Sequence, residues 1–144
     1  MKKILPLLFS ILFFLPAFAV KTINVNPVNL AVVIVEKSDS AKIQQEFAYY
    51  GYTNEGTKDG YTIMRSPNGI EICYSFQDNL PSEKFPTVVV TDEEDDKDLS
   101  KRLFDLNFKR KGNTYTKIAS RDDSHLIQCA FGPSNTLILR CIKR

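Results

Sequence analysis

Histidine is nearly absent from this chain of 144 residues. It occurs once, at His125, and the three cysteines are scattered along the sequence. None of these residues shows the C-x-x-C or H-x-x-x-H spacing that structural zinc sites use, so we expect no metal site. A catalytic pair of cysteine and histidine needs both side chains close together in space. His125 and Cys129 are four residues apart, about 13 Å along a strand, so we expect no catalytic residue here.

Glycine-rich phosphate loops are also missing, because neither G-x-G-x-x-G nor G-x-x-x-x-G-K occurs in the sequence. We therefore expect no cofactor. The glutamates that we consider as a possible pair are Glu36, Glu46, Glu71 and Glu83. Nothing in the sequence singles out two of them as the carboxylate pair that glycoside hydrolysis requires. A hydrolase that uses such a pair stays an alternative hypothesis.

The first 19 residues have the pattern of a secretory signal peptide. Lys2 and Lys3 precede the apolar run from Ile4 to Phe14, and small residues lead to a predicted cleavage after Ala19. The run is shorter than the roughly 20 residues that span a bilayer, and no second run of that length follows. We predict a periplasmic or secreted protein with no membrane insertion after cleavage.

Cleavage would also change the charge of the chain. It removes two of the 19 basic residues and none of the 17 acidic ones, so the net charge falls from +2 to zero. A neutral domain has no global field that attracts nucleic acid, so we expect no nucleic-acid partner. The 125 residues that remain (144 less 19) fit one domain with one core.

The three cysteines, Cys73, Cys129 and Cys141, all follow the predicted cleavage site. In an oxidising compartment two of them can form a disulfide. Cys129 and Cys141 fall on the same face of a predicted hairpin, which makes them the candidate pair. A short turn over residues 132–135 would place them diagonally, however, and disulfide geometry is strict. The alternative is that all three are small buried hydrophobic residues.

The chain after the signal peptide reads as one motif written twice. Each copy has a short β-branched run, a polar link, a helix with apolar residues at i, i+4 and i+7, and a Gly or Asn that suits the left-handed helix end. In the first copy these are Val32–Ile34, the stripe Ile43, Phe47 and Tyr50, and Gly51. Shifted by 56 residues, they are Val88–Val90, the stripe Leu99, Leu103 and Leu106, and Asn107.

Further predicted strands continue this correspondence. Residues 61–64 match 115–118 at a shift of 54, alternating residues 70–76 match 125–131 at a shift of 55, and a last strand spans Thr136 to Ile142. We therefore predict an α+β fold. It is a two-layer sandwich of two tandem strand-helix-strand-strand repeats, with a mostly antiparallel sheet and two helices on one face. The predicted boundaries are an extended lead-in over 20–29, a single domain over 30–144, repeat 1 over 30–76, a linker over 77–84 and repeat 2 over 85–144.

Part of the first copy resembles a half-module of the vicinal oxygen chelate superfamily. The residues that carry the resemblance are Phe47, Gly51-Tyr52, Tyr61–Met64 and Gly69–Ile72. That family repeats a strand, a helix and three strands, and many members bind metal. The resemblance implies a small-molecule-binding module. The first copy lacks a predicted fourth strand, and the histidine and glutamate ligands of the enzymatic members have no matching positions. We therefore carry over no site residues and expect no metal.

Two surface features are candidates for binding. Asp92, Glu93, Glu94, Asp95 and Asp96 belong to a run of six acidic residues in seven positions. Acids favour the N-terminus of the second predicted helix, and so dense an acidic loop also suits a basic partner. Tyr49 is expected to point away from the core stripe of the first helix, and tyrosine is a frequent interface anchor.

These observations favour a small exported binding protein that is not an enzyme. Its most concrete form is an inhibitor or immunity-type protein that binds a secreted toxin or hydrolase. The alternatives are a small-molecule-binding module like that of the vicinal oxygen chelate proteins, without metal, and the carboxylate hydrolase named above.

Overall fold

The computed structural model describes residues 25–76, 85–91, 96–120, 123–133 and 135–144. The predicted signal peptide and the predicted linker 77–84 therefore lie outside the described residues. The elements are α2 (Pro27–Val35), α3 (Ser40–Tyr49), β1 (Thr53–Lys58), β2 (Tyr61–Arg65), β3 (Glu71–Ser75), β4 (Thr87–Thr91), α4 (Asp96–Asp105), β5 (Lys109–Lys111), β6 (Thr114–Ile118), β7 (His125–Gly132) and β8 (Thr136–Lys143).

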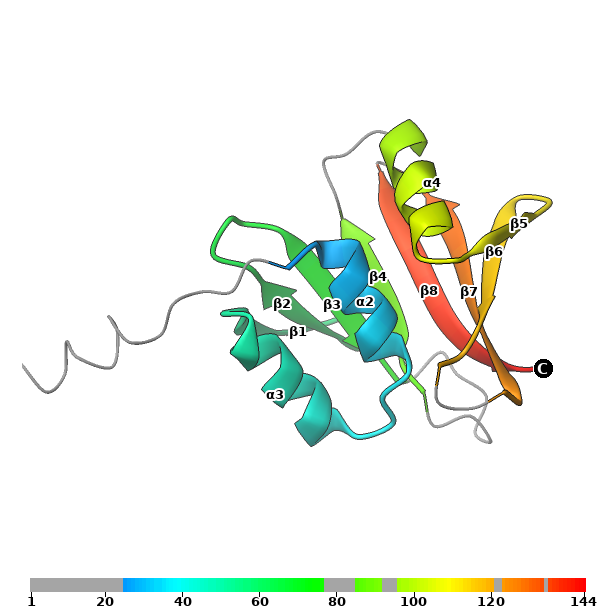
Figure 1. Ribbon diagram of the computed structural model, residues 1–144. Helices are drawn as coiled ribbons and strands as arrows, with labels where there is room; N and C mark the ends of the chain where they lie inside the picture. Colours follow the sequence, from blue (N-terminus) through cyan, green and yellow to red (C-terminus); the bar gives the residue numbers. More distant parts are fainter. Residues whose placement is uncertain (1–24, 77–84, 92–95, 121–122, 134) are drawn as a thin grey trace, which may run out of the picture.

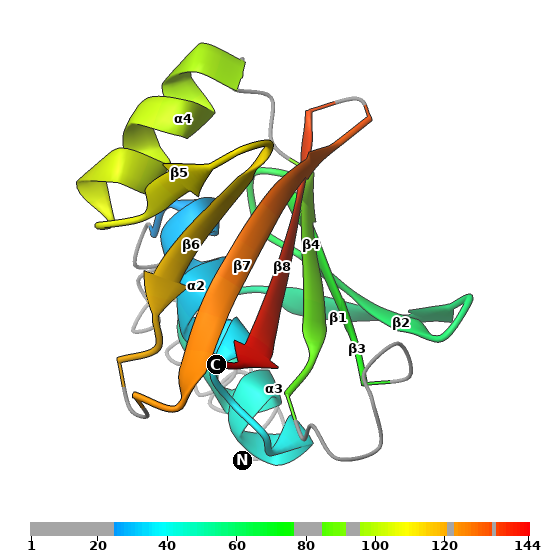
Figure 2. The same cartoon turned by 90° about the vertical axis from the view of Figure 1, so that its right-hand side faces the viewer.

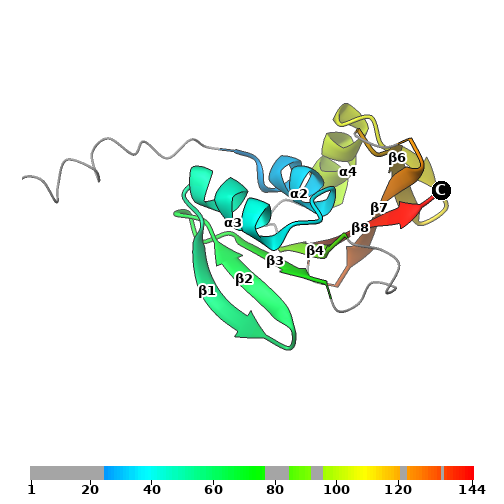
Figure 3. The same ribbon diagram turned by 90° about the horizontal axis from the view of Figure 1, so that it is seen from below.

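All eight strands form one antiparallel sheet in the order β1-β2-β3-β4-β8-β7-β6-β5. The three helices lie next to one another on the same side of this sheet, with α2 between α3 and α4 (Figure 1, Figure 3). The predicted α+β class is therefore confirmed, with more sheet than helix among the described residues. The element order differs from the prediction, because each of α3 and α4 is followed by four strands.

Residues 32–34, predicted as a strand, belong to helix α2. The Asn26 side chain accepts hydrogen bonds from the backbone N–H groups of Val28 and Asn29, and Pro27 occupies the first turn. These are the features of a capped helix start. Residues 27–29 are consequently helical as well, and not part of an extended lead-in. The strand that the vicinal oxygen chelate resemblance requires before its helix is thus not found.

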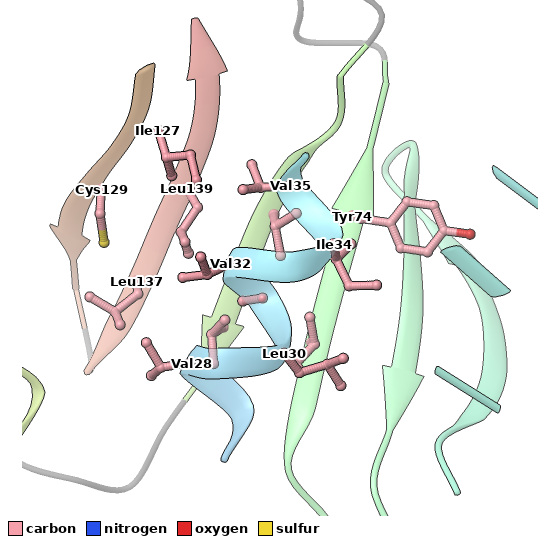
Figure 4. Close-up of a cluster of buried hydrophobic side chains, with 14 of the residues drawn as sticks. Val28, Leu30, Val32, Ile34, Val35, Tyr74, Ile127, Cys129, Leu137 and Leu139 are labelled. Atoms are coloured by element: carbon pink, nitrogen blue, oxygen red, sulfur yellow. The ribbon is translucent and has the colours of Figure 1, made fainter. Parts of the chain in front are cut away.

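Helix α2 covers the centre of the sheet. Seven of its nine residues are buried, which is the condition that lets a helix be apolar around most of its circumference. Its side chains meet those of the central strands β4 and β8, and Figure 4 shows Val32 and Val35 among Ile127, Leu137 and Leu139. The space between this helix and the sheet is filled by core side chains.

Helices α3 and α4 end in the same way, as predicted. Gly51 and Asn107 both have positive φ, at 79° and 69°. The backbone N–H of the following aromatic residue, Tyr52 or Phe108, then donates to the carbonyl of Phe47 or Leu103, at 3.0 Å in each case. The apolar stripes of both helices face the core, and Ile43, Phe47, Leu99 and Leu103 are fully buried.

The strand predictions need two corrections. Strands β1 and β5 were not predicted, since one is polar throughout and the other has only three residues. The shift of 54 between residues 61–64 and 115–118 matches residues that lie on opposite sides of the sheet. Met64 and Tyr115 are both buried under the helices, whereas Ile118, the predicted match of Met64, is 46% exposed.

The cysteine pair considered above does not form a disulfide, and none of the three cysteines, all of which are described, is in one. In the β7–β8 hairpin, Cys129 is opposite Leu139, and Cys141 is opposite Ile127. The two cysteines are therefore diagonal neighbours in register, as a short turn requires. Both are buried beneath the helices, where they behave as small hydrophobic residues.

Candidate functional site

The most unusual surface of the protein is the side of the sheet that faces away from the helices, which we call the open face. In strand β4, Val88 and Val90 are fully buried under the helices, and Val89 between them points to the opposite side. In β8 the same alternation places Ile138 on that side. No described helix lies against the open face (Figure 3). Apolar residues at successive positions, which point to opposite faces of the sheet, are typical of a strand that is covered on both faces.

Strand register joins these residues into one line across the sheet. Ile63 is opposite Cys73, Cys73 is opposite Val89, and Val89 is opposite Ile138, which in turn is opposite Ala130. We call these five residues the apolar row. All five are half-buried. With neighbouring strands about 4.8 Å apart, the row extends about 19 Å across β2, β3, β4, β8 and β7.

The charges beside the apolar row on the β1–β4 half neutralise one another. Arg65 donates to Glu55 through Nε and to Glu71 through Nη2, the latter at 2.9 Å. The Cys73 thiol lies 3.2 Å from the other oxygen of Glu71. Burial, helped by this carboxylate, raises the pKa of Cys73 to about 12. The thiol therefore stays protonated near neutral pH, so it is a poor nucleophile and serves as a member of the apolar row.

The β5–β8 half of the open face is basic instead. The strand positions that share this side carry Lys109 and Lys111 of β5 and Arg140 of β8, and no acidic residue. All three cations are exposed. A depression of about 200 Å³ is lined by Gln128, Ala130, Ile138 and Arg140. A second, of about 350 Å³, is lined by Asn107, Lys109, Thr116, Lys117, Ile118 and Leu126.

The binding residues predicted from sequence are not on the open face as far as they are described. Asp92, Glu93, Glu94 and Asp95 lie outside the described residues, and Asp96 is the first residue of α4. Tyr49, at the end of α3, is 63% exposed, and its ring stands at 89° to that of Tyr50, with the centroids 5.0 Å apart. Helix α2 separates α3 from α4 (Figure 1), so Tyr49 and Asp96 do not belong to one site.

Three of the four glutamates considered for a hydrolase are described, and each has a different neighbour. Glu36 accepts hydrogen bonds from the backbone N and the Oγ of Ser120, at 2.6 and 2.7 Å. Glu46 pairs with Lys37 at 3.9 Å, Glu71 pairs with Arg65, and Glu83 lies outside the described residues. Among the described residues no group of three or more His, Cys, Asp or Glu side chains is placed to hold a metal ion.

The signal for the open face was present in the sequence. Val88-Val89-Val90 and Leu137-Ile138-Leu139 are apolar at every position, whereas a half-buried strand alternates apolar and polar residues. Pattern alone does not say which strands are adjacent, and the row exists only because the register of five strands brings single residues into line.

Comparison of the chain with protein-family models, curated proteins and solved structures found no match. In the described part of the chain, no helix has both the length and the apolar character needed to cross a membrane.

Proposed function

We propose that this chain is a small exported binding protein without catalytic activity of its own, and that it acts as an inhibitor or immunity-type protein toward a secreted toxin or hydrolase. The observation that carries the proposal is the apolar row on the open face. A row of apolar side chains on a sheet face that no described helix covers is typical of an interaction site. Export rests on the sequence pattern of residues 1–19.

The edges of the sheet favour contact through its face. Edge strand β5 has only three residues, and all of them are exposed cations, Lys109, Arg110 and Lys111. Edge strand β1 is interrupted by a register irregularity between Asn54 and Thr57, next to Gly56 with φ of 105°. Short charged strands and bulges prevent another chain from pairing at an edge. A partner is therefore expected to pack against side chains of the open face.

We propose a two-layer sandwich of two tandem units, each a helix followed by four strands. Helices α3 and α4 begin 56 residues apart and have equal length. The strand order runs from β1 to β4 and then back from β8 to β5, so it reads symmetrically from the centre. Such a duplication would explain how a small domain presents a continuous face of eight strands.

A charge-neutral change on the apolar row tests this function. We expect Ile138→Gln to weaken capture of the partner from culture medium or periplasmic extract by at least about tenfold, because a polar amide would be buried without a guaranteed hydrogen-bond partner. The measurement is quantitative mass spectrometry of proteins retained by the immobilised wild type and variants, followed by titration of the retained protein.

The matched control is Val33→Gln, since Val33 is 42% exposed on the helix side of the molecule. This variant should retain the partner within about twofold of wild type. Equal retention by both variants would remove the open face from the proposal, and far-ultraviolet circular dichroism would verify that both proteins remain folded.

The acidic run gives a separate prediction. If Asp92, Glu93 and Glu94 contact a basic surface of the captured partner, replacing all three with Ser should weaken binding and flatten its dependence on salt concentration. Isothermal titration calorimetry at two ionic strengths would measure both quantities. Unchanged affinity would remove these residues from the proposed binding surface.

A further inference from the structure

The open face has a division of charge that the apolar row does not explain. On the β1–β4 half, the strand positions of this side carry Glu55, Lys58, Arg65 and Glu71, two acids and two bases. On the β5–β8 half they carry Lys109, Lys111 and Arg140 without an acid. Among the described residues, the side chains of these three cations form no ion pair. Their charge is thus available to a partner.

Two of the cations stand at the ends of a polar line across four strands. Lys109 is opposite Thr116, Thr116 is opposite Gln128, and Gln128 is opposite Arg140. Three strand spacings separate the end residues, which is about 14 Å. The two depressions lie along this line, one beside Lys109 and Thr116 and the other beside Gln128 and Arg140. Figure 2 shows the four strands that carry this line, β5, β6, β7 and β8, with α2 behind β6 and β7.

Apolar side chains border the polar line on both sides. On one side of the line, Ala130 lies two residues from Gln128 and Ile138 lies two residues from Arg140; both belong to the apolar row. On the other side, Leu126 lies two residues from Gln128 and Ile118 lies two residues from Thr116. A ligand that fits must therefore present negative groups in the middle and aliphatic groups beside them.

We infer that the β5–β8 half of the open face binds an acidic polypeptide segment, whose carboxylates lie between Lys109 and Arg140 and accept hydrogen bonds from Thr116 and Gln128. This inference rests on the proposed function and identifies the chemistry of the partner surface. Lysine, arginine, threonine and glutamine all supply donors to a carboxylate.

A polypeptide fits this half of the face better than a nucleic acid. Proteins that bind single strands stack the bases on aromatic side chains. The open-face positions of β5 to β8 hold no aromatic residue; they hold Lys109, Lys111, Thr114, Thr116, Ile118, Leu126, Gln128, Ala130, Gly132, Thr136, Ile138, Arg140 and Ile142.

The test uses a fluorescein-labelled peptide of ten glutamates as the probe and fluorescence anisotropy at low salt as the readout. We expect saturable binding to the purified protein, weakened at least about tenfold in the double variant Lys109→Gln/Arg140→Gln. The control Lys42→Gln/Lys101→Gln has the same net charge but alters exposed lysines of α3 and α4, and it should bind within about twofold of wild type. Backbone amide shifts in NMR spectra should concentrate at Thr116 and Gln128.

Equal weakening in both double variants would overturn the inference, because binding would then follow total charge and not this site. Displacement of the peptide by an equal concentration of inorganic phosphate would also overturn it, as would tighter binding of a ten-nucleotide single-stranded DNA. None of these results would change the outcome for Ile138→Gln, which tests the apolar row with the native partner. The two proposals therefore fail separately.

Discussion

The variant Ile34→Asp is expected not to fold at 25 °C. Ile34 belongs to α2, and its side chain is fully buried in the core between this helix and the sheet. Val88, Val90 and Leu139 are members of the same cluster. A carboxylate at this position would lose its hydration without gaining a partner, and an uncompensated buried charge costs several kcal/mol. Domains of this size are stable by about 5–15 kcal/mol, and we expect the cost to exceed about 5 kcal/mol, which cancels the stability at the lower end of that range. Guanidinium denaturation followed by circular dichroism is the measurement.

The neighbouring substitution Val33→Asp provides the comparison. Val33 lies on the same helix but is 42% exposed, so its carboxylate would remain hydrated. We expect a cost of about 1 kcal/mol or less, from the unfavourable position of a negative charge near a helix C-terminus. If both variants unfolded equally, α2 would not have a buried and an exposed side, and its position over β4 and β8 would be wrong.

The same helix shows where sequence patterns were insufficient. Val32-Val33-Ile34 is β-branched, and β-branched residues favour strands, yet this segment is helical. Asn26 and Pro27 carried the opposite local signal, that of a capped helix start. Burial decides between the strand signal and the helix signal. A helix satisfies its own backbone hydrogen bonds, so it can lie buried across a sheet face. A buried strand would need a neighbouring strand on each edge.

Other elements were predictable because their signals were local. The stripes of α3 and α4 and the left-handed residues Gly51 and Asn107 depend on spacings of three or four residues and on one backbone conformation. Strand β5 was not predictable in this way. Lys109-Arg110-Lys111 has no apolar residue, and it is a strand because β6 lies beside it.

The candidate site was the least predictable part. The sequence pattern pointed to the acidic run, in which acidic residues are dense, and to Tyr49, which was conspicuous as a tyrosine expected to point away from the core. The open face instead depends on pairings such as Cys73 with Val89 and Ala130 with Ile138. The residues of these pairs are 16 and 8 positions apart in the sequence. A shift of register by one residue would turn the side chains of the shifted strand to the other side of the sheet.

The protein is expected to lose stability steeply as the pH rises above 9, and buried Cys129 is the residue that we hold responsible. Burial raises the pKa of Cys129 from 9.0 to about 12. Above pH 9 the unfolded chain therefore releases a proton that the folded protein still holds, so stability is full below pH 9 and falls as pH rises toward 12. Three pH units correspond to a loss of about 4 kcal/mol for this group.

Substituting Cys129 isolates its contribution from that of the rest of the protein. Guanidinium denaturation from pH 8 to 11 under reducing conditions should give Cys129→Ala a shallower fall in unfolding free energy than wild type, by about 1 kcal/mol per pH unit above pH 9. Leu139→Val is the control, because Leu139 is opposite Cys129 in the β7–β8 register and its loss of volume leaves the thiol in place. This control should be less stable at every pH but keep the wild-type slope. A wild-type slope in Cys129→Ala would mean that the thiol does not stay protonated in the folded protein, and hence that the core beneath α2 admits water.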